Sequence, residues 1–111
     1  MRSARLDDMI RGWFVGDFEP TALRTDAVEV AVKRYEAGDT EELHYHRVAT
    51  ELTAVLSGEV RMCGRVWGAG DIIVLDPGEA TSFEAISAAT VIAVKTPGAR
   101  NDKYPGSREK N

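Results

Sequence analysis

The sequence predicts an all-β fold, a sandwich or barrel of short strands. Apolar segments rich in valine and isoleucine recur along the chain, and turns that contain glycine separate them. A turn about every eight to twelve residues is typical of β-sandwiches and β-barrels. A chain of 111 residues suits one domain and is long enough to bury a core.

The expected strands follow one another between these turns. They comprise residues 27–35, 44–46, 51–57, 59–63, 66–67, 72–75, 81–85 and 90–95. In the first of them, Val28, Val30 and Val32 alternate with other residues, so we expect these valines to face the core. Residues 36–43 are expected to form a turn-rich acidic connection.

The domain is expected to have a core and two peripheral segments. The core covers about residues 26–96, within a single domain of residues 1–111. Residues 1–20 form an N-terminal arm, whose aromatic segment 13–18 is expected to be an edge strand or a contact with a second subunit. Residues 97–111 form a polar tail, of which about the last six residues are expected to be mobile.

The composition argues against several classes of partner. The 14 basic and 18 acidic residues give a net charge of −4 without a long basic run, which argues against nucleic acid and anionic membranes. No apolar stretch reaches the roughly 18 residues that span a bilayer, and the N-terminus lacks the apolar segment of a secretory signal. We therefore expect a cytoplasmic protein with a small-molecule ligand. The single cysteine, Cys63, excludes an intrachain disulfide.

The most informative stretch runs from Gly38 to Gly58. It contains both histidines of the chain, His44 and His46, two residues apart, and Glu51 follows five residues later. Side chains two residues apart on a strand share a face, so both imidazoles are expected to point the same way. A turn after His46 would let the next strand aim Glu51 at the same point. Converging imidazole and carboxylate groups are good ligands for a divalent transition metal.

This stretch resembles the first sequence motif of the cupin superfamily, and especially that of the germins. The motif positions are filled in register by Gly38, His44, His46, Glu51 and Gly58. The frame of the second cupin motif is matched by Gly70, Pro77 and Gly78. Two positions depart from it: Asp76 stands at a usual proline, and Thr81 stands where the family has a third metal-binding histidine. The resemblance covers about residues 26–95.

The resemblance implies a small single-domain cupin with the double-stranded β-helix, or jelly-roll barrel, of that family. It also implies a metal site, but two histidines cannot supply the three-histidine, one-glutamate set of the germins within one subunit. His44, His46 and Glu51 would instead form a two-histidine, one-carboxylate set that leaves coordination positions open. Iron, manganese, nickel, zinc and cobalt suit such a site, in an oxygenase or an isomerase.

Two other interpretations stay open at this point, and the sequence does not decide whether the protein is an enzyme. Without a metal, His44 or His46 would act as a catalytic acid or base, because histidine titrates near neutral pH. The protein would then be an isomerase or epimerase, like small cupins that act on sugar nucleotides. Alternatively, the chain would bind a small molecule without converting it.

Strand parity extends the expected pocket beyond the three ligands. Thr53 and Val55 follow Glu51 by two and four residues. Phe83 follows Thr81 by two residues. All four side chains are therefore expected to line the pocket, with a mostly apolar wall as in many small-molecule sites.

Surplus apolar surface predicts an oligomer. The strand 51–57 is apolar on both faces, and a strand of that kind is covered on both faces. Together with the aromatic segment 13–18, it exceeds what one small barrel can bury. We expect a homodimer with two-fold symmetry, the commonest kind of oligomer.

Overall fold

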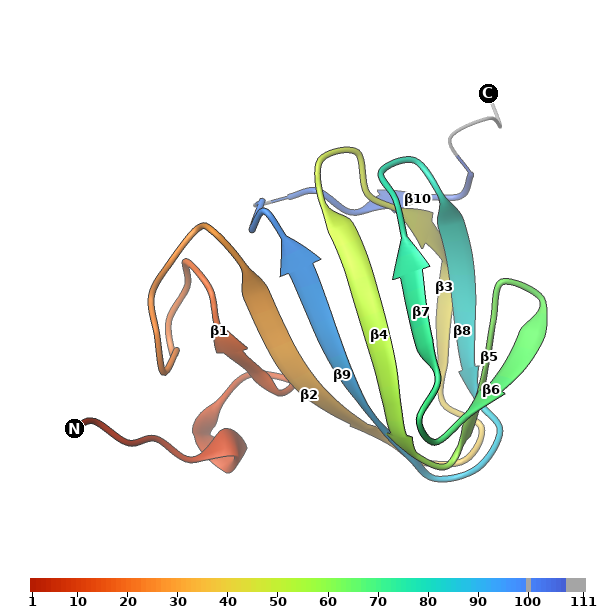
Figure 1. Cartoon of the computed structure of the whole chain (residues 1–111), viewed down its shortest axis with the longest axis horizontal. Helices are drawn as coiled ribbons and strands as arrows, with labels where there is room; N and C mark the ends of the chain where they lie inside the picture. The colour runs from red at the N-terminus through yellow and green to blue at the C-terminus, as the bar shows by residue number, and fades with distance from the viewer. Residues whose placement is uncertain (100, 108–111) are drawn as a thin grey trace.

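In the computed structural model, the chain forms two antiparallel five-stranded sheets that face each other (Figure 1). The structure describes residues 1–99 and 101–107. The strands are β1 (Trp13–Val15), β2 (Glu29–Tyr35), β3 (Thr40–Tyr45), β4 (Thr50–Ser57), β5 (Glu59–Met62), β6 (Arg65–Gly68), β7 (Ile72–Leu75), β8 (Ala80–Ala85), β9 (Ala89–Thr96) and β10 (Tyr104–Pro105), preceded by the 3-10 turn η1 (Leu6–Asp8). The all-β prediction is confirmed, and the described part of the chain has no helix long and apolar enough to cross a membrane.

The strand order explains how residues distant in sequence meet. One sheet has the order β1-β2-β9-β4-β7 and the other the order β10-β3-β8-β5-β6. The strand that carries the histidines is longer than predicted, because β3 already pairs with β8 at Thr40, within the expected connection 36–43. A shift of register between Glu41 and His44 then resets the pairing before the strand ends at Tyr45.

The core lies between the inner faces of the two sheets. Its buried side chains come from β4, β5, β7, β8 and β9, and they are Val55, Val60, Met62, Ile73, Leu75, Phe83, Ala85, Ala89 and Val91. Tyr35 and Trp67 pack against this cluster from its margin. Burying such side chains is the main favourable term in the folding of a domain of this size.

The prediction that Val28, Val30 and Val32 face the core is wrong. On β2 the inner face belongs to the alternate residues, of which Ala31 is fully buried. Val30 and Val32 are cross-strand neighbours of Val94 and Ile92 on the outer face. The valine pattern misleads because the outer face of this sheet is itself apolar, so alternation alone does not identify the inner side.

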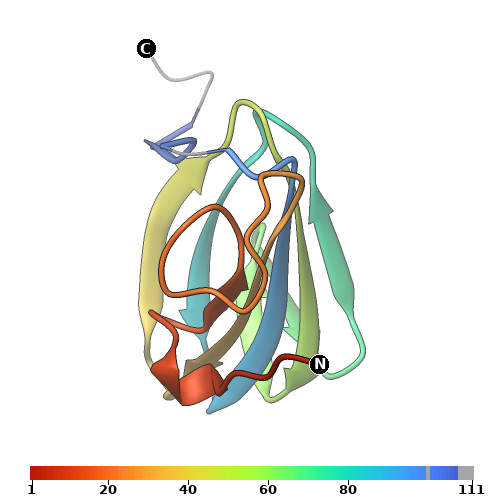
Figure 2. The same ribbon diagram turned by 90° about the vertical axis from the view of Figure 1, so that its left-hand side faces the viewer.

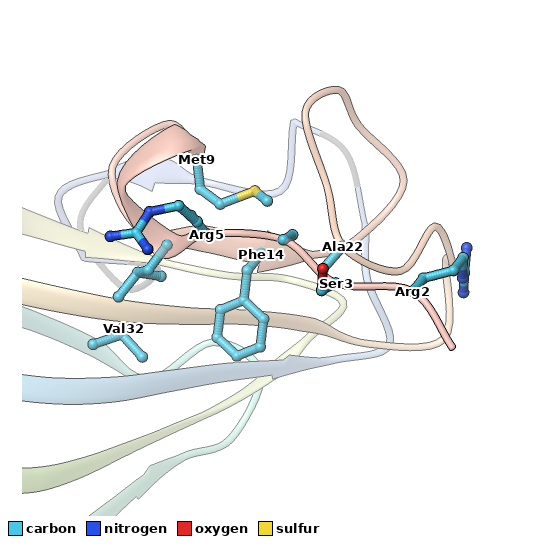
Figure 3. Close-up of a pocket in the computed structure, with 9 residues that line it drawn as sticks. Arg2, Ser3, Arg5, Met9, Phe14, Ala22 and Val32 are labelled. Carbon is cyan, nitrogen blue, oxygen red and sulfur yellow. The ribbon is translucent and has the colours of Figure 1, made fainter.

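The N-terminal segment covers part of that outer face. The predicted edge strand is present, since β1 pairs antiparallel with β2, and Figure 2 shows the segment lying across the side of β2. Between η1 and β2 lies a hollow of about 540 Å³. In Figure 3, Phe14 and Val32 border this hollow beside Arg5 and Met9 of the N-terminal segment. The arm thus supplies apolar cover to the β2 valines.

The end of the chain is not a loose polar tail up to residue 107. β10 pairs with β3, where Tyr104 faces Tyr45 and Pro105 faces His44. The main-chain N–H of Gly106 also donates to the carbonyl of Leu43 at 2.9 Å. The expected mobility of the last six residues falls mostly on residues 108–111, which lie outside the described residues.

Glycine at position 58 is required both by the backbone and by space. Gly58 has a φ of +79°, and a Cβ there would overlap the main-chain oxygen of Ala88. Gly70 has a φ of +93° but open space around it.

We expect Gly70→Ala to lower the free energy of unfolding by about 1–2 kcal/mol through backbone strain. Gly58→Ala should lower it by about 1–3 kcal/mol more, because the added Cβ also overlaps its neighbours. Urea unfolding measures both, and equal losses would contradict the steric argument.

Candidate metal centre

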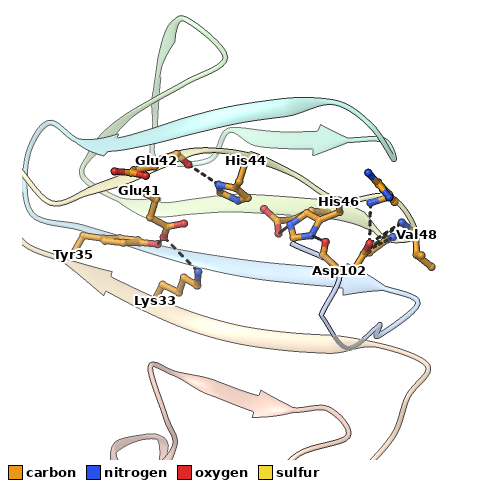
Figure 4. A network of polar contacts seen from close by, with 11 residues as sticks. Lys33, Tyr35, Glu41, Glu42, His44, His46, Val48 and Asp102 are labelled. Carbon is orange, nitrogen blue, oxygen red and sulfur yellow. Dashed lines mark hydrogen bonds and ion pairs between the residues drawn. The ribbon is translucent and has the colours of Figure 1, made fainter. Parts of the chain in front are cut away.

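His44, His46 and Glu51 come together in the interior, where Figure 4 shows the two histidines. His44 lies near the end of β3, His46 follows that strand directly, and Glu51 is the second residue of β4. Each offers one ligand atom, and these atoms lie within 4.8 Å of one another. The side chains reach one point because the turn between β3 and β4 reverses the chain. Both histidines are buried.

Both imidazoles are held through the same ring nitrogen. Nδ1 of His44 donates to the carbonyl of Glu42 at 2.8 Å, and Nδ1 of His46 donates to the carbonyl of Asp102 at 2.5 Å. A carbonyl oxygen only accepts, so Nδ1 carries a proton in both rings, and in a neutral ring the lone pair is on Nε2. Metal-binding histidines in proteins are commonly fixed in this way. Each ring therefore offers Nε2 as a ligand atom.

The contact between His46 and Glu51 suits a shared cation. Nε2 of His46 is buried and has no hydrogen-bond partner among the described residues. Oε2 of Glu51 lies 3.1 Å from it. In a neutral His46 ring protonated on Nδ1, these two atoms are both acceptors, an arrangement that is costly inside a protein. A divalent cation bound by both atoms would satisfy both.

The protonation states suit metal binding. Burial lowers the pKa of His44, which keeps its imidazole neutral. Burial alone would raise the pKa of Glu51, but the His46 side chain and the Lys95 ammonium outweigh it and hold that pKa below its usual value. Neutral imidazole and ionised carboxylate are the forms that bind metals. The residues present therefore fit a divalent transition metal.

Two of the three ligands, His44 and Glu51, line a small cavity. Its volume is about 20 Å³, which is close to the space that one water molecule needs. The lining residues are Lys33, Tyr35, Glu41, His44, Glu51, Thr53, Met62, Thr81, Phe83, Val91 and Ala93. Of the expected pocket residues, Thr53, Thr81 and Phe83 line it. Val55 does not: it has the right parity but lies deeper, in the core cluster.

Thr81 lies beside His44 without the properties of a good ligand. The two residues are cross-strand partners between β3 and β8. Its hydroxyl donates to the carbonyl of Ser82 at 2.6 Å and accepts from the N–H of Cys63 at 3.0 Å. The hydroxyl is thus engaged with the main chain, and the metal set stays at three protein ligands.

A second polar group in the cavity was not predicted from the sequence. The hydroxyl of Tyr35 donates to Oε2 of Glu41 at 2.6 Å, and Nζ of Lys33 is 3.5 Å from the same oxygen. Burial, followed by the Glu41 carboxylate, raises the pKa of Tyr35. Burial alone would raise the pKa of Glu41, yet the Lys33 ammonium and the Tyr35 hydroxyl hold it low. The only signal in the sequence was the shared parity of Lys33 and Tyr35.

Asp102 is the other residue that sequence reasoning missed. Besides holding His46 with its carbonyl, it accepts with its carboxylate from the N–H groups of Arg47, Val48 and Ala49 at 2.9–3.1 Å. Burial alone would raise its pKa, but these three donors lower it. The residue thereby fixes the turn between the histidines and Glu51. Its distance in sequence from His46 gave no signal for this role.

We expect Asp102→Ala to loosen the turn that carries the ligands. The change leaves three main-chain N–H groups without their acceptor, so the free energy of unfolding should fall by about 1–3 kcal/mol. Loss of groups that orient ligands typically weakens metal binding about 10–100-fold. Asp102→Asn keeps one acceptor oxygen and should lose less in both measurements. An Ala variant with unchanged unfolding in urea and unchanged cobalt affinity would contradict this role.

Comparisons with solved structures identify the fold. The sequence matches no protein-family model and no curated protein. A protein with a double-stranded β-helix domain from Klebsiella pneumoniae is 23% identical, over 76% of this chain and 74% of that chain, with a TM-score of 0.67. An RmlC-like cupin from Shewanella frigidimarina is 23% identical, over 70% of this chain and 72% of that chain, with a TM-score of 0.61.

A larger protein contains a similar domain. The oxalate decarboxylase of Bacillus subtilis, described with Mn(II) centres, is 22% identical with a TM-score of 0.60. That alignment covers 73% of this chain but only 24% of the decarboxylase. Such identities establish the architecture and not the reaction. With its two facing sheets and these neighbours, the chain has the double-stranded β-helix fold.

Proposed function

We propose that this protein binds a divalent transition metal and a small molecule, with His44, His46 and Glu51 as the metal ligands. The observation that carries the proposal is the convergence of the three side chains, whose ligand atoms lie within 4.8 Å of one another, with the buried Nε2 of His46 3.1 Å from the Glu51 carboxylate. The neutral state of His44 and the low pKa of Glu51 support the same role. The Mn(II) centres of a decarboxylase with a similar fold support a metal, without fixing which one.

The chain's own residues would position, shield and exchange protons. A metal with three protein ligands keeps open positions and polarises a substrate oxygen or binds dioxygen, as in isomerases and oxygenases. Met62, Phe83 and Val91 line the site with apolar surface that limits access of water. As ligands, both histidines would have no ring nitrogen left for acid–base catalysis. Proton transfer would fall instead to the Glu41 carboxylate and the Tyr35 hydroxyl.

A direct metal titration tests this function. We expect the purified, untagged protein to bind Co²⁺, Mn²⁺ or Zn²⁺ with one ion per chain, measured by calorimetry and elemental analysis. Glu51→Gln and His44→Ala should abolish binding, because each removes one of only three ligands. Glu59→Gln makes the same change at an exposed site and should bind like the wild type. If the wild type binds none of these ions, the histidines are left as proton-transfer or pocket-lining groups.

A variant that adds a ligand gives an independent test. Thr81→His places an imidazole next to His44 on the neighbouring strand, where it would complete a three-histidine set. We expect metal affinity to rise roughly tenfold or more, about 1–2 kcal/mol for an added ligand. Should neither the wild type nor this variant bind a metal, the three side chains do not converge in solution.

We also propose that two copies pair through the outer face of the β1-β2-β9-β4-β7 sheet. Its apolar side chains adjoin one another across three strands: Leu52, Ala54, Leu56, Ile72, Val74, Ile92 and Val94. Ile72 and Val74 are 62% and 52% exposed. An exposed apolar patch of this kind marks an interaction surface. A second copy offers the same uncharged patch, so a two-fold contact covers both at once.

The assembly is tested by one substitution on each sheet. Light scattering of the wild type should give about twice the chain mass of 12.1 kDa. Val74→Lys should give the single-chain mass, because it buries a charge in the contact. Val66→Lys is the matched control, an equal change at an exposed valine of the other sheet. A wild type that stays at the single-chain mass over a wide concentration range would refute the dimer.

A further inference from the structure

The cavity beside the metal ligands is closed to molecules larger than water. Its volume of about 20 Å³ is close to the space of one water molecule. Most of its wall consists of buried side chains, and these are Thr53, Met62, Thr81, Phe83, Val91 and Ala93. Apart from Glu51, the partly exposed residues of the wall are Lys33, Tyr35 and Glu41. Because close-packed interiors resist displacement, the wall yields most readily at these three side chains.

A much larger groove lies on the other side of the same three side chains. Its volume is about 560 Å³. Lys33, Tyr35 and Glu41 line both the groove and the cavity, so they form the partition between the two. Figure 4 shows the Tyr35 and Lys33 side chains pointing to Glu41. Leu6 and Met9 of the N-terminal segment belong to the groove wall as well.

The groove is placed at a side of the barrel that the main chain leaves open. β2 belongs to one sheet and β3 to the other, so the gap between these two described strands is closed by side chains. β1 pairs with β2 at Val30 and Ala31, and the groove begins just beyond this pairing, at Val32. The His46 side of the site is covered instead by the C-terminal segment, through Asp102.

An irregularity of β3 brings Glu41 into the partition. Residues three apart lie on opposite faces of a regular strand, but the pairing of β3 with β8 shifts between Glu41 and His44. As a result Glu41 is opposite Phe83 and His44 is opposite Thr81, two residues that share the inner face of β8. Such bulges commonly redirect a side chain beside a functional site. The carboxylate of Glu41 therefore lies in the same interior as the His44 imidazole.

The contacts at the partition allow Glu41 to move. The Tyr35 hydroxyl donates to Oε2 of Glu41 at 2.6 Å, and Nζ of Lys33 lies 3.5 Å from that oxygen. The Lys33 and Glu41 side chains are 24% and 25% exposed, so both charges can turn toward water without being left buried and unpaired. The Tyr35 ring packs on Phe83 with its centroid at 4.4 Å. Glu41 is thus the movable part, and the Tyr35 hydroxyl holds it in the closed position.

The groove has no excess of either charge. Its charged residues are three acidic and three basic ones, namely Asp7, Asp39, Glu41, Arg11, Lys33 and Arg34. Asp7 lies 3.6 Å from Arg34, as Glu41 lies near Lys33. A balanced set of charges gives little electrostatic steering of either ions or neutral molecules. Passage along the groove therefore depends on size.

We propose that small molecules reach the metal sideways, through this groove between β2 and β3, and that Lys33, Tyr35 and Glu41 form its gate. The inference rests on the proposed metal function and adds to it the route of the ligand. Rotation of Glu41 toward water joins the cavity to the groove, which supplies the room that the closed cavity lacks. An entering molecule passes the Tyr35 hydroxyl and the Glu41 carboxylate before it reaches the metal ligands.

The test measures how fast a small probe reaches the metal. The protein is loaded with Co²⁺, and azide binding is followed by the change in visible absorbance after rapid mixing. The exposed thiol of Cys63 is first removed by Cys63→Ser. In this protein Thr40→Cys places a thiol at an exposed position of the groove wall. Glu59→Cys is the matched control, at an exposed position of β5 outside the groove. A bulky thiol reagent is attached after folding and cobalt loading.

We expect the label on Thr40→Cys to slow azide association about tenfold or more, an increase in the barrier of about 1.4 kcal/mol. The label on Glu59→Cys should leave the rate unchanged. Met9→Trp fills the groove without a reagent and should slow association as well. Unchanged rates in both blocked proteins overturn the entrance while the metal function stands. If the wild type binds no cobalt, the proposed function fails and the entrance with it.

A second pair of variants tests the gate. Tyr35→Phe removes the hydroxyl that holds Glu41 and keeps the ring that packs on Phe83. The open state should become more populated, so azide association should be about tenfold faster, as for the loss of one hydrogen bond to a charged group. Tyr104→Phe makes the same change on β10, beside the C-terminal segment, and should have no effect. An unchanged rate in Tyr35→Phe, or an equal acceleration by Tyr104→Phe, overturns the gate.

Discussion

The structure depends on how His46 is held between two acceptors. Its Nδ1 is tied to the carbonyl of Asp102, and its Nε2 faces the carboxylate of Glu51. The first contact joins the end of the chain to β3, and the second joins β3 to β4. Because both are buried, neither can be relieved by water. The turn, the C-terminal segment and the polar character of the site all follow from keeping this one ring in place.

The sequence was sufficient to predict which side chains lie at the site where their arrangement depends on residues close in sequence. His44 and His46 share a face because they are two residues apart, and Glu51 returns to them after one short turn. The positions of Thr53 and Phe83 follow from the same alternation, and both line the cavity. Alternation predicts on which face of a strand a side chain lies. It does not predict whether that side chain borders the cavity or lies deeper in the core. For that reason Val55 has the expected side and still belongs to the core.

Contacts between segments that are distant in sequence could not be predicted. Nothing near Asp102 indicates that it binds three main-chain N–H groups of the turn after His46, because that contact depends on β10 pairing with β3. The valines of β2 were misplaced for a related reason. Their sheet is apolar on both faces, so the choice of inner face rests on Ala31, which must fit against the tightly packed interior. Periodicity contains no information about that choice.

The same choice of face has a chemical consequence. Had the valines faced inward, the interior beside the ligands would be apolar. Instead β2 turns Lys33 and Tyr35 inward, and Lys33 finds Glu41 across the gap between the sheets. Partly buried charged groups are stable only when opposite charges accompany them. A change at one of these groups therefore alters the electrostatic energy of the others. A change at Lys33 would therefore also alter the pKa of Glu51, which the Lys33 charge helps to lower, although the sequence pattern placed this strand the wrong way round.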